Sequence, residues 1–194
     1  MEPKEVQSPH EDYQNPNEVI QTVASNHPAA TEFRQRPHVK LLRSVLKPPE
    51  ADIPYNLTLT TLVGPGMISE EPYVLADDEA GALLVFYYLG PRLAGHSRIV
   101  HGGIAGVLLD ECMGRACFPR LEGQIAVTAT LELEYKSPIS VDSVVLIRAE
   151  TTDVQGRKAW VRATVENAKD GTVYVEGKGL FIEPRWSAQL PKVM

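Results

Sequence analysis

One apolar segment with a paired glycine at its start constrains the fold of this 194-residue chain more than any other feature. It begins at His101-Gly102-Gly103, continues as IAGVLLDECMGRACF and ends at Pro119. The helix that it predicts carries apolar or small residues on nearly every side, and a helix that is apolar all round is buried all round. A single sheet can bury a helix in this way only by curling around it.

The segments on either side of this helix predict the strands of such a sheet. Residues 82–89 are apolar throughout, and residues 125–135 alternate between apolar and polar side chains. Three more strands are expected over 141–151, 157–166 and 172–182, and one over 57–67 before the helix. The connections are short, which favours antiparallel pairing. We therefore expect an α+β fold, with a curled antiparallel sheet of about six strands around one central helix.

The N-terminal quarter of the chain differs in character from the rest. Residues 1–17 are polar and proline-containing and predict a disordered tail. Residues 18–50 predict a helical extension that prolines interrupt, with a second short helix over 39–46. The compact domain is expected over 51–184, followed by a C-terminal tail over 185–194.

Composition argues against several classes of protein. The net charge of −6 argues against nucleic acid as the main partner. Cys112 and Cys117 lie five residues apart on one predicted helix and project in different directions, so neither a disulfide nor a metal site is expected. The first residues are acidic and lack an apolar run, and no stretch reaches the ~18 apolar residues of a membrane span. These features predict a cytoplasmic location.

The chemistry suggested by the central segment depends on its glycines and its aspartate. Paired glycines at a helix start allow backbone N–H groups to approach an acceptor oxygen closely. Asp110, deep in an apolar helix, must be neutralised, hydrogen-bonded or used in a reaction. A donor site and a carboxylate are two parts that acyl transfer requires. The alternatives are a tight turn at the glycines and an aspartate that bonds only to the sheet backbone.

Three motifs in this order resemble one known family. The HGG segment is followed nine positions later by Asp110, then by the turn Tyr135-Lys136-Ser137-Pro138 and the turn Gln155-Gly156-Arg157-Lys158. In these features residues 55–184 resemble the hotdog-fold acyl-CoA thioesterases of the PaaI-like and THEM-like group. The resemblance implies hydrolysis of an acyl thioester, with coenzyme A or a carrier pantetheine as part of the substrate and no separate cofactor. It also implies a homodimer, with a tetramer left open, in which the glycine and the acid of one site come from different subunits.

The resemblance also assigns roles to individual residues. Gly102, with help from Gly103, binds the thioester carbonyl, and Asp110 acts as general base or nucleophile. Thr128 lies near the acid, although strict alternation places it opposite the apolar face unless a bulge changes the register. His101 is either a base or, as we prefer, the residue that orients the loop. The candidate substrate-binding residues are His96, as a polar partner on the carbonyl side, and Arg98, Lys136, Arg157 and Lys158, as cations for the coenzyme A phosphates.

Two other functions remain open at this point. The first is a hotdog dehydratase or hydratase that acts on 3-hydroxyacyl thioesters, with His101 and Asp110 as its acid and base. The second is a non-catalytic module that binds acyl-CoA or a protein partner, for which the extension over 18–46 is the supporting feature.

Overall fold

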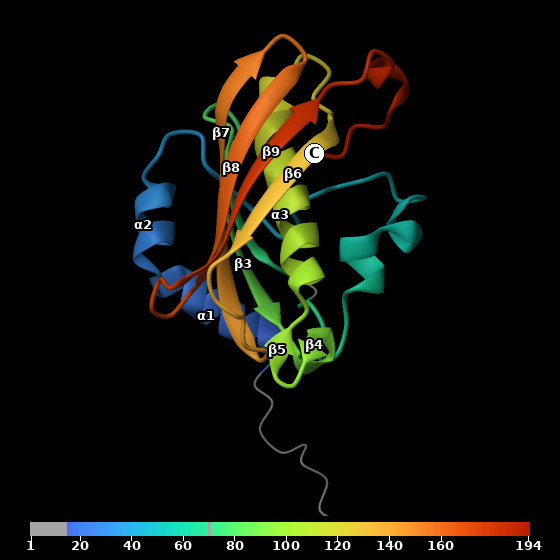
Figure 1. The fold of residues 1–194 in the computed structure, drawn as a ribbon. Coiled ribbons are helices and arrows are strands. Elements are labelled where there is room, and N and C mark those ends of the chain that lie inside the picture. Colours follow the sequence, from blue (N-terminus) through green and yellow to red (C-terminus); the bar gives the residue numbers. More distant parts are fainter. Residues whose placement is uncertain (1–14, 70) are drawn as a thin grey trace, which may run out of the picture.

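The computed structural model describes residues 15–69 and 71–194 (Figure 1). Most of the tail expected over 1–17 lies outside the described residues, but Pro16 and Asn17 already belong to the first helix. Among the described residues, no helix is long and apolar enough to cross a membrane.

One helix runs along the inner face of one antiparallel sheet, as expected (Figure 1). The helix is α3 (Gly102–Cys117), and within the described part of the chain the sheet has seven strands in the order β1-β2-β3-β7-β8-β9-β6. The strands are β1 (Lys40–Leu42), β2 (Tyr73–Asp77), β3 (Ala82–Leu89), β6 (Val127–Tyr135), β7 (Ser143–Gln155), β8 (Lys158–Asn167) and β9 (Val173–Ile182). Every neighbouring pair is antiparallel. This arrangement confirms the predicted hotdog fold.

Short elements connect the strands to the helix. A two-stranded hairpin, β4 with β5, lies just before α3. These elements are η1 (Ile53–Tyr55), η2 (Leu57–Thr61), η3 (Pro91–Leu93), β4 (Ala94–His96), β5 (Ile99–Val100), η4 (Phe118–Arg120) and η5 (Ser187–Gln189).

The core has two layers, one on each side of the sheet. On the inner side, Leu108, Leu109 and Met113 of α3 are fully buried against the strands. On the outer side, the N-terminal helices bury alternate residues of β3, such as Leu84 and Phe86. Because both faces of β3 are covered, its sequence is apolar throughout rather than alternating.

The N-terminal extension covers part of the outer face through α1 (Pro16–Asn26) and α2 (Pro28–Arg34), as Figure 1 shows. Each helix has proline in its first turn. Proline lacks a backbone N–H, but an N–H at this position would have no partner within the helix in any case. The short helix expected over 39–46 is wrong, because β1 forms there and pairs with β2. The free edge of β2 offers backbone partners that a helix of this length, bounded by prolines, does not provide for itself.

The strand expected over 57–67 is also wrong. Residues Leu57–Thr61 form a single π-helical turn beside α3. The side chain of Asn56 caps this turn, since its Oδ1 accepts the N–H groups of Thr58 and Leu59, both at 3.0 Å. The partial alternation of this segment therefore reflects a half-buried turn with a capping residue at its start.

Candidate active site

The start of α3 has one backbone donor to spare. The N–H of Gly103 donates to His101 Nδ1 at 2.9 Å, and the N–H of Ile104 donates to the carbonyl oxygen of His101 at 2.9 Å. The N–H of Gly102 has no acceptor among the residues that the structure describes. Gly102, rather than Gly103, is therefore the free donor at the positive end of the helix.

His101 caps the helix with its side chain. Since Nδ1 accepts a hydrogen bond, a neutral His101 carries its proton on Nε2. The β4–β5 hairpin packs directly against this residue, because a Cβ on Gly95 would lie 2.7 Å from His101 Cδ2. This geometry favours the role of orienting the loop over that of a base.

Asp110 meets Thr128 across the gap between α3 and β6. Thr128 Oγ1 donates to Asp110 Oδ1 at 2.7 Å. The register of β6 against β9 shifts at this point, so that Thr128 pairs with Phe181 and Thr130 with Leu180. Phe181 is buried in the inner core, so its partner Thr128 faces the helix. A β-bulge at Ala129 therefore turns Thr128 towards Asp110, against the strict alternation of the strand.

The free donor and the carboxylate of one chain are far apart. Gly102 and Asp110 are separated by eight residues (110 − 102), which is about 12 Å along a helix. A carbonyl group that accepts a hydrogen bond from Gly102 is consequently out of reach of Asp110 in the same chain.

A second carboxyl group, next to Asp110, is held in a different way. Glu111 makes a short hydrogen bond with Thr58 Oγ1, and this hydroxyl also lies 3.1 Å from Asn56 Oδ1. Burial raises the pKa of Glu111. The side chain thus ties the η2 turn to α3 instead of joining Asp110. Sequence reasoning missed this contact, although an Asn two residues before a Thr is a recognisable capping signal.

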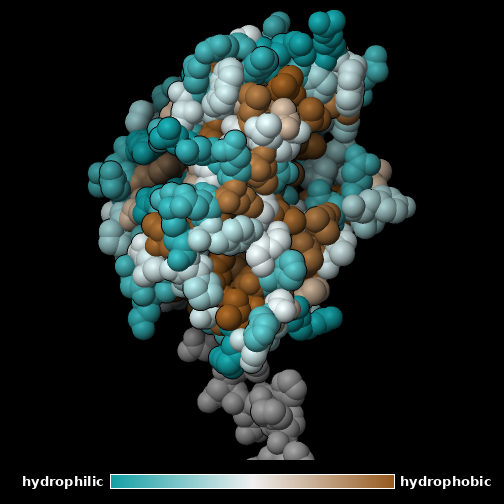
Figure 2. Space-filling model, viewed as in Figure 1, coloured by the Kyte–Doolittle hydropathy of each residue, from teal (hydrophilic) through white to brown (hydrophobic). Residues whose placement is uncertain are grey.

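A small cavity opens beside the start of α3. Its volume is about 340 Å³, and its lining includes Gly102, Tyr135 and Lys136. The rest of the wall comes from residues 99–100 and 137–139 and is largely apolar. Figure 2 shows that apolar residues also extend along the middle of the face on which α3 and β6 lie. Gly102, which carries the free N–H, therefore lies at the edge of an apolar recess.

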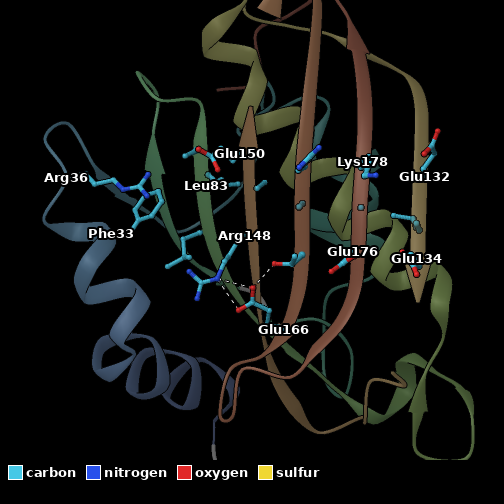
Figure 3. Close-up of a pocket in the computed structure, with 18 residues that line it drawn as sticks. Phe33, Arg36, Leu83, Glu132, Glu134, Arg148, Glu150, Glu166, Glu176 and Lys178 are labelled. Atoms are coloured by element: carbon cyan, nitrogen blue, oxygen red, sulfur yellow. Dashed lines mark hydrogen bonds and ion pairs between the residues drawn. The ribbon is translucent and has the colours of Figure 1, made fainter. Parts of the chain in front are cut away.

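A larger cavity, of about 690 Å³, lies on the other side of the sheet (Figure 3). Its surface is charged, and Arg148 Nε lies 3.0 Å from both carboxylate oxygens of Glu166. Lys178 and Glu132 of this groove project away from α3, from neighbouring strands. The sheet separates this groove from Gly102 and Asp110, so the larger cavity is not the candidate active site.

The five expected substrate-binding residues divide into two groups. The first group lies near the start of α3. His96 and Arg98 lie in or beside the β4–β5 hairpin there, and Lys136 lines the small cavity next to Gly102. Lys136 also forms ion pairs with Glu134 at 2.6 Å and Glu176 at 3.4 Å.

Arg157 and Lys158 lie at the opposite end of the sheet. Lys158 pairs in register with Ile182, which in turn pairs with Val127 at the start of β6. Arg157 donates to the carbonyl oxygen of Glu183 at 2.7 Å. Within one chain, this pair is therefore remote from Gly102.

The described residues contain no group of three or more His, Cys, Asp or Glu side chains that could hold a metal ion. Cys112 and Cys117 are free thiols buried in the core, and burial raises the pKa of both. Neither lies at the start of α3, and both are far less reactive than exposed thiols.

The fold and this site define a hotdog protein with an amide donor at the start of its central helix and a carboxylate further along it. Residues 98–174 match the family model of the thioesterase superfamily. The solved structure of a mutant of the phenylacetic acid degradation protein PaaI from Thermus thermophilus resembles the chain with a TM-score of 0.54 and 20% identity, over 66% of this chain and 98% of that one. A second solved structure, of a thioesterase superfamily protein, has a TM-score of 0.53 and 20% identity, over 89% of this chain and 80% of that one.

Curated relatives are more similar in sequence. An uncharacterized mitochondrial protein of Candida albicans is 31% identical over 64% of this chain and 58% of its own length. MIOREX complex component 3 of Saccharomyces cerevisiae is 33% identical over 62% and 44%, and acyl-coenzyme A thioesterase THEM4 of Mus musculus is 35% identical over 48% and 40%. The chain spans about half the length of these relatives.

The expected cytoplasmic location is contradicted by this comparison, because the Candida relative is named as a mitochondrial protein. The acidic residues near the start of the chain were the basis of that expectation. Acidic content in one short segment does not determine the compartment in which the folded domain works.

Proposed function

We propose that this chain hydrolyses acyl thioesters of coenzyme A at a site that two copies of the chain build together. The observation that carries the proposal is the hydrogen bond between Thr128 and Asp110, for which the strand accommodates Ala129 in a bulge instead of turning Thr128 outwards. A carboxylate so held, in an otherwise apolar helix, is poised to act on water or on a carbonyl carbon. Similarity to the acyl-coenzyme A thioesterase THEM4 supports the substrate class.

The reaction uses both the N–H of Gly102 and the carboxylate of Asp110. The thioester carbonyl oxygen accepts the N–H of Gly102, which stabilises the negative charge that develops on that oxygen. In one route Asp110 takes a proton from water as the water oxygen bonds to the carbonyl carbon. In the other route the carboxylate itself attacks, and water then hydrolyses the mixed anhydride. In both routes the C–S bond breaks, and the products are a carboxylic acid and a free thiol.

The distance of about 12 Å between Gly102 and Asp110 within one helix requires a second copy. β6 is an edge strand of the sheet, and its side chains Val127 and Tyr135 are exposed. An exposed edge strand readily pairs with the same strand of another copy. In such an antiparallel homodimer, Asp110 of the partner subunit approaches Gly102, and a tetramer would add no catalytic group.

The same pairing accounts for the two groups of candidate substrate-binding residues. Antiparallel β6 strands bring the Val127 end of one subunit to the Tyr135 end of the other. Lys136, His96 and Arg98 would then meet Arg157 and Lys158 of the partner subunit around one cavity. Phosphate groups of coenzyme A favour such basic side chains. Coenzyme A serves here as part of the substrate, and no separate cofactor takes part.

A hydratase or dehydratase fits less well. His101 uses Nδ1 to accept the N–H of Gly103, which leaves only Nε2 for proton transfer.

Release of free thiol from a series of acyl-CoAs tests the proposal. The series covers short, medium, long and aryl acyl groups, with wild type and Asp110→Asn side by side. We expect thiol release by wild type from at least one acyl-CoA, and almost none by the variant. Hydration of crotonyl-CoA without thiol release would support a hydratase. Binding of acyl-CoA by both proteins, with no turnover, would support a binding module and overturn the proposal.

A further inference from the structure

Both ends of a single peptide unit at the start of α3 are hydrogen-bonded to side chains. This unit joins Gly102 to Gly103. Its carbonyl oxygen accepts the hydroxyl of Tyr135 at 2.9 Å, and its N–H donates to His101 Nδ1 at 2.9 Å. One side chain comes from the far end of β6 and the other from the residue just before the helix.

A peptide unit between two glycines needs such restraint. Glycine has no Cβ to limit rotation of the backbone, so this unit can turn more easily than any other in the first turn of the helix. The free N–H of Gly102 belongs to the preceding peptide unit, which meets this one at the Cα of Gly102, so the φ and ψ angles of Gly102 determine how that N–H is directed relative to the clamped unit and the helix. On the other side, the N–H of His101 donates to the carbonyl oxygen of Leu93 at 2.8 Å, which holds the chain before the glycines.

Tyr135 is itself firmly placed. The two residues after it, Lys136 and Ser137, both donate their N–H groups to the carbonyl oxygen of Tyr174, at 2.8 and 3.2 Å. Its ring covers Gly102 so closely that a Cβ there would lie 3.3 Å from Cε1 of the ring. The absence of a side chain at Gly102 thus allows the tyrosine to reach the carbonyl.

We propose that Tyr135 is a positioning residue, which clamps the Gly102–Gly103 peptide together with His101 and thereby aims the free N–H of Gly102 into the adjacent cavity. The catalytic consequence rests on the proposed function, because that N–H is the donor to the thioester carbonyl. Tyr135 does not need to touch the substrate in order to act. Its hydroxyl also makes the Gly102 carbonyl a stronger dipole, since hydrogen bonds in a chain polarise one another.

Tyr135→Phe tests the clamp, since it removes the hydroxyl and keeps the ring over Gly102. Tyr55→Phe is the matched control, because Tyr55 is 87% exposed. Two readouts are used: hydrogen exchange of the Gly103 amide by NMR, and kcat and KM for the best acyl-CoA substrate. We expect Gly103 exchange to rise, and kcat to fall, by about three- to tenfold each, the factor that one hydrogen bond is worth. KM and the unfolding midpoint should stay close to those of wild type.

Each outcome decides a separate question. Unchanged Gly103 exchange in Tyr135→Phe would overturn the clamp. Faster exchange with unchanged kcat would overturn its part in catalysis, and a change in KM or stability alone would indicate an ordinary packing role. If wild type hydrolyses no acyl-CoA, the proposed function fails, while the exchange rates still decide whether the clamp exists.

Discussion

Asp110 and Glu111 are neighbours in sequence, yet their surroundings give them different tasks. Asp110 accepts a hydrogen bond from Thr128 of β6, whereas Glu111 is tied to Thr58 of the η2 turn. Successive helical residues project about 100° apart, so each carboxyl group reaches a different element. The first is held at the face that carries β6, and the second fastens the connection that precedes β2.

We predict that Asp110→Asn lowers kcat for thioester hydrolysis by about 10²- to 10⁴-fold, because an amide cannot act as base or nucleophile. Thr128→Val should lower kcat less, by about tenfold, because it removes one hydrogen bond to Asp110 and leaves the carboxylate in place. Steady-state kinetics with unfolding curves check both changes. Glu132→Gln, on the opposite face of β6, is the control, and an equal loss there would contradict the assignment.

Glu111→Gln should change how stability depends on pH. Burial raises the pKa of Glu111, so the folded chain binds this proton more tightly than the unfolded chain. The resulting stabilisation is fully present below the ordinary pKa of a glutamate and is lost as the pH rises through the raised pKa. The free energy of unfolding of wild type minus that of Glu111→Gln should therefore fall with rising pH in urea titrations. A difference that rises with pH would show that the folded state prefers the charged form.

Several features of individual residues could be predicted from the sequence, and others could not. The paired glycines and Asp110 follow from the unusual composition of one helix. The contact between Tyr135 and Gly102 joins positions 33 residues apart and has no local signature. The inward direction of Thr128 depends on a bulge, which alternation of side chains cannot reveal.

At the scale of the elements, the bulge in β6 makes a specific prediction. Thr128 pairs with Phe181 and Thr130 with Leu180, so Ala129 is the extra residue. Deleting Ala129 should give a regular strand in which Thr128 still faces α3. We expect the deletion variant to hydrolyse thioester, and Thr128→Val to lower its activity as in wild type. If Thr128→Val had no effect in the deletion variant, Thr128 would not face α3 there, which would contradict the assignment of Ala129 as the extra residue.

α1 is predicted to contribute stability rather than catalysis. Ile20 is fully buried against the outer face of the sheet. Ile20→Ala should lower the free energy of unfolding by about 2–4 kcal/mol, the usual cost of such a truncation. Thr22→Ala, on the exposed side of the same helix, is the control, and kcat should not change in either variant. If Ile20→Ala had the same free energy of unfolding as wild type, α1 would not be packed as described.

Elements with a strong hydrophobic periodicity could be predicted from the sequence, whereas elements that depend on contacts with neighbouring elements could not. α3 and the strands after it follow from composition and alternation. β1 forms because the edge of β2 lies beside it, and η2 forms because Asn56 caps it and Glu111 holds it. Such contacts override the weak preferences of short segments.

At the scale of the whole molecule, the proposed reaction requires two copies of the chain. A single chain separates the N–H of Gly102 from the carboxylate of Asp110 by about 12 Å. Its sheet ends in the edge strand β6, which contacts Asp110 near one end and Gly102 near the other. Sequence patterns indicate such an edge but not its occupant, because pairing between copies depends on surfaces that form only after folding.

Mixing two inactive variants tests the shared site most directly. Gly102→Pro removes the donor N–H, and proline is favoured at the first position of a helix and compatible with the extended backbone of His101 (ψ 129°) before it. Its ring also crowds Tyr135, since a Cβ at Gly102 would lie 3.3 Å from Cε1 of that ring, but the intact site of a heterodimer with Asp110→Asn takes its Gly102 from the other chain. Heterodimers of Gly102→Pro with Asp110→Asn are purified with two different tags. If each site combines Gly102 of one chain with Asp110 of the partner subunit, one of the two sites is intact, and about half of the wild-type kcat per dimer returns. Heterodimers as inactive as both parents would contradict the account.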